Sequence, residues 1–463
     1  MTQDLLILGA GPAGLGAAFW TARAGKDVVV LERAERVGGA AGSVEIEGMR
    51  VDLGSHRLHP SIEPSILADL RRLLGDELQP RERNGRIRLQ GRWISFPLRG
   101  KEILTKMPPA FVLGAARDAL TSPVRRSRAG SFADVLQSGL GRTICNRFYF
   151  PYARKIWGVE PEELSAEQAR RRVSADSPLK VLARALRGSK EGGAAGAGYF
   201  LYPEGGYGTI SEALAEGARA VGADIHLGTA AERIRLRDGG AEVETSRGVT
   251  FSARRVWSTL PITVLARMVD PPAPDEVIAA ASALRSRAMV LVYLVLDVDR
   301  FSPFDAHYLP EAFTPVTRFS EPKNYRRGSD PVGRTVLCAE IPCDLGDATW
   351  KSSTEELGAV ACDGIAAAGL PRPQTSSVEV RRLSHAYPIY LRGYEPHFDA
   401  LDKWAADSGI LTFGRQGLFA HDNAHHALAM ASAAAKALDQ DGSFNDADWA
   451  GARERFGEHV VED

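Results

Sequence analysis

Short apolar runs separated by amphipathic stretches predict the elements at the start of the chain. An apolar run over residues 5–8 leads into a glycine-rich turn, a helical stretch follows, and a second apolar run covers residues 28–31. Short apolar runs bounded by turn residues are typical of buried strands, and a strand–helix–strand order favours a parallel sheet. The opening of the chain therefore predicts a βαβ unit.

Short apolar runs and amphipathic stretches also occur later in the chain. Strands are expected at residues 224–226, 230–237, 241–245, 255–259, 289–296 and 410–415. Helices are expected at residues 62–74, 209–221 and 423–438. Residues 100–190 lack strand alternation and are rich in alanine, leucine and arginine, so this region is expected to be mainly helical.

Three segments are expected to be turns or loops. Asn84-Gly85 lies between two short alternating runs, and this dipeptide is a strong signal for a hairpin turn. Residues 188–198 are rich in glycine and alanine, which is typical of a loop. The polar tail after Asp439 is expected to fray.

Segments with strand and helix patterns like those of the opening unit return twice, which predicts a discontinuous domain. At 463 residues the chain exceeds the size of one hydrophobic core. We expect the α/β class, with a Rossmann-like FAD/NAD(P)-binding domain formed by residues 1–75, 199–270 and 405–463. Residues 76–198 and 271–404 are expected to form an inserted substrate domain with a mixed sheet and helices.

Composition narrows the class of protein. Hydrophobic residues make up 44% and charged residues 25% of the chain, and the formal net charge is −1. These values argue against disorder, an integral membrane segment and a nucleic-acid partner. The four cysteines show no C-x-x-C pairing and no histidines at zinc spacing, so we expect reduced thiols, no metal and a cytoplasmic location. The sequence leaves the oligomeric state undecided, with a homodimer as one alternative.

One region departs from this charge balance. Between residues 71 and 128, fourteen lysines and arginines face five acidic residues. A solvated basic face is the commonest explanation of such an excess. An anionic substrate and weak docking on an acidic membrane are the two alternatives.

The glycine turn carries the first chemical signal. Gly9 ends the strand, Gly11 lets the backbone approach a pyrophosphate, and Gly14 allows close packing of helix on strand. The helix N-terminus offers unpaired N–H groups to that phosphate. Glu32 follows about 20 residues later, where a carboxylate accepts hydrogen bonds from the ribose hydroxyls and disfavours a 2′-phosphate.

A second glycine cluster after Glu32, residues 38–42, distinguishes FAD from NAD because it lies where a longer cofactor leaves the pyrophosphate. The arrangement resembles the N-terminal signature of the flavoprotein superfamily of amine oxidases, protoporphyrinogen oxidases, phytoene desaturases and UDP-galactopyranose mutases. The resemblance implies an FAD cofactor. The N-terminal residues implied to contact it are Gly9, Gly11, Pro12, Ala13, Gly14, Glu32, Arg33, Gly39, Ala40, Ala41, Gly54, Ser55, His56 and Arg57.

Later segments also resemble flavin-contacting segments of this superfamily. Ala231 stands where relatives place a valine, and Ala424 stands where many relatives place a methionine. In the C-terminal motif an arginine reaches the pyrophosphate and a helix N-terminus faces the flavin. The residues implied are Ala231, Thr259, Gly414, Arg415, Asp422, Asn423 and Ala424.

The loop from Gly54 to His59 resembles the histidine loop of UDP-galactopyranose mutases, where an imidazole lies over the flavin and could donate a hydrogen bond. A loop histidine satisfied by a carbonyl is the plainer alternative. The candidate catalytic residues are His56, Lys155 and Tyr387. The candidate substrate-binding residues are Trp157, Arg171, Arg318, Tyr325 and Tyr390, with arginine holding an anion.

Three functions follow from these patterns. The first is an FAD-dependent oxidoreductase that dehydrogenates a small polar or anionic metabolite by hydride transfer to flavin N5. The second is a redox-neutral sugar-nucleotide mutase or isomerase that uses reduced flavin as a nucleophile. The third is a flavin-binding protein without turnover.

Overall fold

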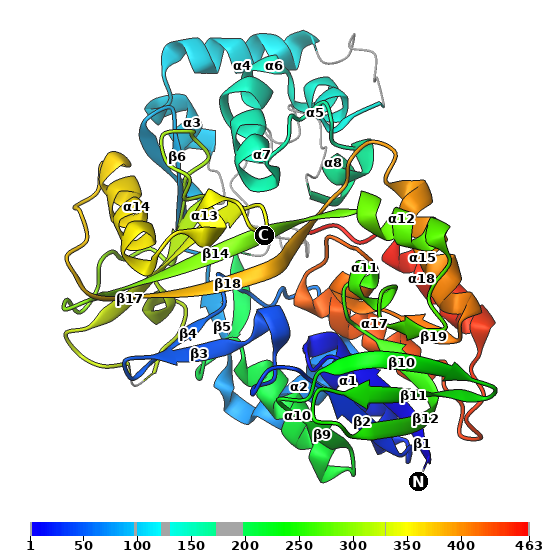
Figure 1. Ribbon diagram of the computed structural model, residues 1–463. Coiled ribbons are helices and arrows are strands. Elements are labelled where there is room, and N and C mark those ends of the chain that lie inside the picture. The colour runs from blue at the N-terminus through cyan, green and yellow to red at the C-terminus, as the bar shows by residue number, and fades with distance from the viewer. Residues whose placement is uncertain (1, 97–99, 122–129, 173–197, 329, 462–463) are drawn as a thin grey trace.

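A computed structural model describes residues 2–96, 100–121, 130–172, 198–328 and 330–461. The chain forms a mixed α/β fold with two large sheets and a separate group of helices, which Figure 1 shows at its upper edge. In the described part of the chain, no helix has the length and apolar character needed to cross a bilayer.

The first sheet is eight-stranded in the described residues and begins with the predicted βαβ unit. Strand β1 pairs in parallel with β2 on one side and β12 on the other. Residues Leu5 to Leu8 are buried, as expected for a central strand covered on both faces. The strands are β1 (Thr2–Leu8), β2 (Val28–Leu31), β9 (Asp224–His226), β10 (Ala231–Arg237), β11 (Gly240–Thr245), β12 (Thr250–Ser258), β13 (Val269–Asp270) and β19 (Ile410–Thr412).

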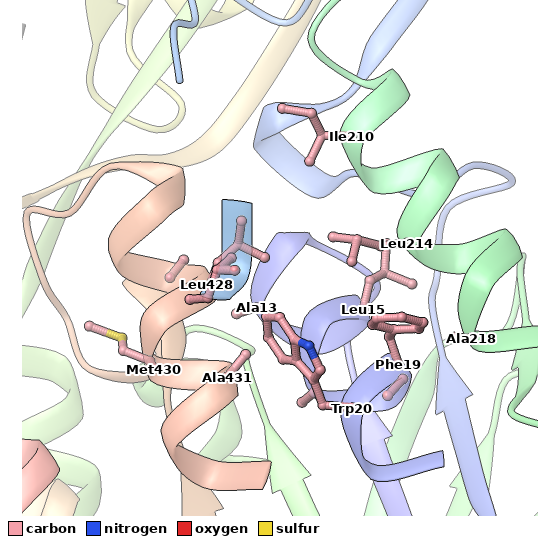
Figure 2. Packing of buried hydrophobic residues seen from close by; sticks show 14 of the residues in the cluster. Ala13, Leu15, Phe19, Trp20, Ile210, Leu214, Ala218, Leu428, Met430 and Ala431 are labelled. Atoms are coloured by element: carbon pink, nitrogen blue, oxygen red, sulfur yellow. The ribbon is translucent and has the colours of Figure 1, made fainter. Parts of the chain in front are cut away.

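Helices from three distant segments pack together beside this sheet, as Figure 2 shows. They are α1 (Pro12–Arg23), α10 (Thr209–Ala220) and α17 (Ala424–Lys436). Trp20 and Leu15 of α1 lie between Leu428 and Leu214 in this cluster. Gly16 allows the approach, because a Cβ there would come 2.9 Å from Trp20 and 3.1 Å from Leu428.

The second sheet has the order β18-β14-β17-β16-β15-β6-β7 and is mainly antiparallel. Its strands are β6 (Gly85–Leu89), β7 (Arg92–Phe96), β14 (Arg285–Leu296), β15 (Ala306–Tyr308), β16 (Arg318–Ser320), β17 (Thr335–Cys343) and β18 (Thr375–Ile389). Helix α14 (Thr354–Ala367) packs on β14 and β18. Two small sheets pair β3 (Ser43–Ile46) with β4 (Met49–Asp52) and β5 (Leu78–Glu82) with β8 (Tyr199–Pro203).

The predicted helical region forms the group at the top of Figure 1. Its helices are α3 (Gly100–Lys106), α4 (Pro109–Thr121), α5 (Phe132–Leu140), α6 (Arg142–Ile144), a π-helical turn over Cys145–Tyr149, α7 (Phe150–Trp157) and α8 (Ala166–Arg172). The other helices are α2 (Pro64–Leu74), α11 (Ile262–Leu265), α12 (Asp275–Ala283), α13 (Ala348–Lys351), α15 (Glu395–Asp407), α16 (Gly414–Gly417) and α18 (Asp446–Phe456).

Two local predictions are wrong. Asn84-Gly85 does not join a hairpin, because β5 pairs with β8, while β6 turns at Gln90-Gly91 to pair with β7. The C-terminal tail does not fray: α18 forms, and Ala452 and Phe456 are buried in the core beside the first sheet. The predicted loop over residues 188–198 lies, except for residue 198, outside the described residues.

Candidate active site

A cavity of about 2170 Å³ connects the carboxyl end of β1 with the second sheet and the upper helices. One end is lined by the glycine turn and Glu32. The other end is lined by aromatic side chains, among them Phe132, Phe148 and Trp157. A binding site at the carboxyl ends of parallel strands is the usual position in such α/β sheets.

The glycine turn has the geometry that a pyrophosphate requires. Gly9 has a φ of +102°, which favours glycine, and a Cβ at Gly14 would come 1.9 Å from the Gly9 carbonyl oxygen. A Cβ at Gly11 would meet nothing within 4 Å, so the space above the turn is open. No side chain caps the first turn of α1, which leaves backbone N–H groups for an anion. Gly9, Gly11, Pro12 and Ala13 line the cavity, and Gly14 lies behind it.

Glu32 is oriented by the backbone on either side of it. Its Oε2 accepts the Ala10 N–H at 2.9 Å and its Oε1 accepts the Ala34 N–H at 2.9 Å. A carboxylate has about four acceptor positions, so capacity for ribose hydroxyls is left. Gly39 packs against Gly11, with a Cβ at Gly39 reaching the Gly11 Cα at 3.4 Å. The same wall contains Arg33, Ala40, Ala41 and Ala231.

Arg415 is a partly buried cation beside this turn. Its Nη2 donates to the Ala386 carbonyl at 2.7 Å, its guanidinium lies 4.9 Å from the Tyr387 ring, and its Nε has no hydrogen-bond partner. Among the described residues no carboxylate forms an ion pair with Arg415, and burial lowers its pKa. Gly414 packs against Ala13, and the Thr259 Oγ1 donates to the Leu8 carbonyl at 2.9 Å. The backbone N–H groups at the start of α1 and the Arg415 guanidinium form a donor set that fits a diphosphate.

A bulge in β18 makes the Arg415 contact available. The pairing of β14 with β18 shifts register between Arg287 and Met289, opposite Tyr387 and Leu383. The extra residues on β18 leave the ladder, and the carbonyls of His385 and Ala386 accept hydrogen bonds from Gln416 and Arg415. Bulges commonly redirect backbone groups beside functional sites. Leu383 to Tyr387 line the cavity.

Asp422, Asn423 and Ala424 line the cavity at the start of α17. The Asp422 Oδ1 lies 3.4 Å from the His426 Nδ1 and 3.3 Å from the His459 Nδ1. These two histidines hold the pKa of the buried carboxyl well below its usual range. The C-terminal segment beside His459 therefore contributes to this wall, and its Val460 and Val461 also line the cavity.

His56 is a neutral acceptor. Its Nε2–H donates to the Leu53 carbonyl at 3.0 Å, its ring stacks on Tyr207, and burial lowers its pKa. The free position of the neutral ring is Nδ1, which has a lone pair. The Nε2–H is thus used within the protein, and the hydrogen bond expected from the imidazole to the flavin stays a prediction.

Glu340 joins the histidine loop to the second sheet. Its carboxylate accepts the Ser55 N–H at 2.9 Å and two bonds from Arg318 at 3.0 and 2.8 Å. Arg57 is paired with Asp305 at 3.2 Å. Gly54, Ser55, His56, Arg57 and Arg318 line the cavity. Glu340 occupies the Nε and Nη2 of Arg318, and the anion contact expected of Arg318 stays a prediction.

Four predicted site residues do not line the cavity. The Lys155 Nζ donates to the carbonyls of Leu309 and Glu311, and burial lowers its pKa to about 7. Arg171 pairs with Glu167 and holds the Phe456 carbonyl. Tyr325 is fully buried under Arg57. Tyr390 is buried and stacked on Tyr394 with ring centroids 4.2 Å apart. These four predictions are corrected because each side chain has a structural partner elsewhere.

The structure brings other residues to the substrate end that the sequence did not single out. Arg172 lies 5.1 Å from the Tyr387 ring and 5.8 Å from the Trp157 ring, and all three line the cavity. Helical phase explains the difference from Arg171, since adjacent residues on a helix point about 100° apart. Other lining residues absent from the predicted site are Tyr149, Tyr152, Tyr308 and Glu340.

Solved structures of other proteins share this fold. A structure of reduced UDP-galactopyranose mutase aligns with a TM-score of 0.84 at 21% identity, covering 99% of this chain and 100% of that chain. A putative protoporphyrinogen oxidase from Exiguobacterium sp. 255-15 aligns with a TM-score of 0.71 at 19% identity, covering 94% and 99%. At these identities the likeness establishes the fold.

Sequence comparison identifies the family. A putative flavin-containing monoamine oxidase of Mycobacterium tuberculosis is 27% identical over 289 residues, which is 59% of this chain and 61% of that protein. The chain thus spans less than two thirds of that relative. The flavin containing amine oxidoreductase family matches residues 12–427, and this match confirms the resemblance predicted above. The chain therefore belongs to the flavin containing amine oxidoreductase family.

Proposed function

We propose that the protein is an FAD-dependent oxidoreductase that dehydrogenates a small polar or anionic metabolite by hydride transfer to flavin N5. The observation that carries the proposal is the cavity itself. It runs without interruption from the glycine turn, beside which Arg415 lies, to an aromatic chamber whose walls include Arg172. Neither arginine has an ion-pair partner in the described part of the chain.

The chain's own residues fit the cofactor. The family is flavin containing, in agreement with the predicted FAD. Gly11 and the start of α1 would hold the diphosphate, Glu32 the ribose, and Arg415 a phosphate charge. When bound, the flavin supplies the hydride acceptor, which no protein side chain provides.

The chamber residues would orient the substrate. Trp157 and Tyr387 supply flat apolar walls, and Arg172 between them supplies a positive charge for an anionic group. His56 presents an unprotonated Nδ1, which is able to accept a proton from a substrate N–H or O–H group. Binding, orientation and proton acceptance are thus assigned to separate side chains.

The mutase remains the second candidate. The likeness to UDP-galactopyranose mutase spans the whole chain, and the His56 loop and Trp157 segment both lie at the cavity. A mutase returns its substrate with no net redox change, so the two functions differ in whether an electron acceptor is needed.

Anaerobic spectroscopy tests the proposal. The FAD-loaded protein is mixed with panels of amines, amino acids, hydroxy acids and nucleotide sugars, and the visible absorbance of oxidised FAD is followed. The proposal expects at least one polar or anionic compound to remove that absorbance and to be recovered as a product two hydrogens poorer. Conversion of a nucleotide sugar to an isomer only after reduction by dithionite would replace the oxidoreductase with the mutase. No conversion under either condition would support a binding protein.

A further inference from the structure

Helices α3 and α4 present exposed leucines at the edge of the molecule farthest from the first sheet. Leu113 and Leu120 of α4 are 71% and 79% exposed, and Leu104 of α3 is 48% exposed. Leu113 and Leu120 are seven residues apart, so they lie on one side of α4 two turns apart. Figure 1 shows α4 along the upper edge of the structure. We name Leu113 and Leu120 the leucine face.

Helix α4, which carries the exposed leucines, is held firmly on its other side. On the opposite side of α4, Phe111 and Ala119 are buried, and the Asp118 Oδ2 accepts the Thr143 N–H of α6 at 2.6 Å. Phe111 packs in the same cluster as Phe148, whose side chain also lines the active-site cavity. The leucine face is therefore the outer surface of a layer whose inner surface forms the cavity wall.

A basic groove adjoins the leucine face. It has a volume of about 590 Å³ and runs between α4 and the residues of α6 and the π-helical turn. Leu113 lies at this groove together with Arg117, Arg142 and Arg147. Across the described ranges, no carboxylate forms an ion pair with any of these three arginines. The one carboxylate of α4, Asp118, is buried, and residues 142–149 contain none.

This combination of surfaces selects one kind of partner. Exposed leucines gain free energy when they leave water, and unpaired arginines attract an anionic surface. A symmetric contact with a second copy would place the same arginines against one another, which is repulsive. We propose that the leucine face and the arginine groove dock the protein peripherally on an anionic lipid bilayer. The leucines enter the headgroup region and the groove holds lipid phosphate.

The proposal explains the basic excess of residues 71–128 in part and does not depend on the proposed reaction. Within this region Arg72 and Arg88 are paired with Asp69 and Glu311. The arginines of the groove, by contrast, have no such partner among the described residues. Of the groove's arginines, Arg117 belongs to this excess, while Arg142 and Arg147 follow it in the chain.

Vesicle flotation with the full-length FAD-loaded protein tests the docking. Vesicles of phosphatidylcholine alone are compared with vesicles that also contain phosphatidylglycerol, at low salt. The expected result is flotation with the anionic vesicles only, reduced in 1 M salt because the screening length falls to about 3 Å. Replacing Arg117, Arg142 and Arg147 by alanine should weaken binding about fivefold for each arginine, since each contributes about 1 kcal/mol near an anionic surface.

Matched variants separate docking from general stickiness. Leu113→Asn with Leu120→Asn should weaken flotation at least tenfold, whereas Leu345→Asn and Arg219→Ala should not change it. Leu345 is 60% exposed and Arg219 is exposed on α10, both away from the leucine face. Absence of flotation with anionic vesicles, or equal flotation of the leucine variant and its control, would overturn the proposal. Reversible self-association abolished by Leu113→Asn, without flotation, would replace the bilayer with a second copy.

Discussion

The two ends of the cavity are built in different ways. At the cofactor end the glycine turn and Glu32 lie within the first 32 residues, and Gly39, Thr259 and Arg415 complete the lining. At the substrate end the lining comes from the upper helices, the histidine loop and several strands of the second sheet, among them β14, β17 and β18. The cofactor end depends on backbone conformation, whereas the substrate end depends on ion pairs between distant residues.

The two ends of the cavity should therefore differ in how well they tolerate substitutions. A steric requirement at a glycine allows almost no substitution, because any Cβ meets fixed backbone. An ion pair such as Arg318–Glu340 can be exchanged if both partners change together. The cofactor end should therefore break at single positions, and the substrate end should respond to pairs.

The largest effect is expected at Gly14. Its Cβ would lie 1.9 Å from the Gly9 carbonyl oxygen, so Gly14→Ala should yield little folded, FAD-containing protein. Gly451→Ala in α18 is the control, because its Cβ meets only the end of Arg455 at 3.9 Å and alanine favours a helix. The measurement is FAD bound per soluble chain. Equal FAD content in both variants would contradict the steric account.

The buried ion pair should give the next largest effect. Glu340→Gln leaves the Arg318 guanidinium buried without a charge partner, which should lower the free energy of unfolding by about 3–5 kcal/mol. Arg318→Met combined with Glu340→Met should cost less than the two single changes added together. Urea unfolding of the wild type, Arg318→Met, Glu340→Met and the double variant measures this coupling. Additive losses would show that the pair does not stabilise the substrate end as a unit.

Replacing Arg172 should affect the substrate end of the cavity and leave the cofactor end unchanged. Arg172→Met should raise the KM for an anionic substrate by about 10- to 100-fold, because a charge-assisted hydrogen bond contributes about 1.5–3 kcal/mol. FAD binding should not change, since Arg172 lies at the substrate end. Arg170→Met is the control, because Arg170 is exposed and pairs with Glu167 outside the cavity. Similar KM values in both variants would remove Arg172 from the substrate site.

The last prediction concerns Lys155 and the pH dependence of stability. Burial lowers its pKa in the folded chain from 10.5 to about 7, so between these values the unfolded chain binds more protons. The free energy of unfolding of the wild type should therefore rise relative to Lys155→Met from pH 7 to 9.5, by at most about 1.4 kcal/mol per pH unit. Turnover should stay near wild type. A structural role for Lys155 would be contradicted if the stability of the wild type and of Lys155→Met changed equally with pH. It would also be contradicted if Lys155→Met lost turnover at normal stability.

Local patterns explain which parts of the molecule were predicted from the sequence. The βαβ unit, its glycine turn and Glu32 depend on residues close together in the chain, so their spacing alone indicates their geometry. The helix over residues 209–221 and the strand over 289–296 follow from periodicity in the same way. The structure describes the helix as Thr209–Ala220 and places residues 289–296 within β14.

The errors come from long-range partners. Asn84-Gly85 carries a hairpin signal, but β8, more than a hundred residues later, pairs with β5 instead. Tyr325 was predicted in the cavity on residue type, but it is fully buried under Arg57. The adjacent arginines 171 and 172 differ only in helical phase, which composition does not reveal. No spacing rule identifies such partners.

Cofactor binding by the open turn is the central claim, and titration of FAD-free protein tests it most directly. We expect the wild type to take up one FAD per chain. Gly11→Val should remain folded, because its side chain enters open space and its backbone is extended, yet it should bind FAD at least a hundredfold more weakly. Folded wild type that takes up no FAD, or equal affinity in the two proteins, would contradict the account.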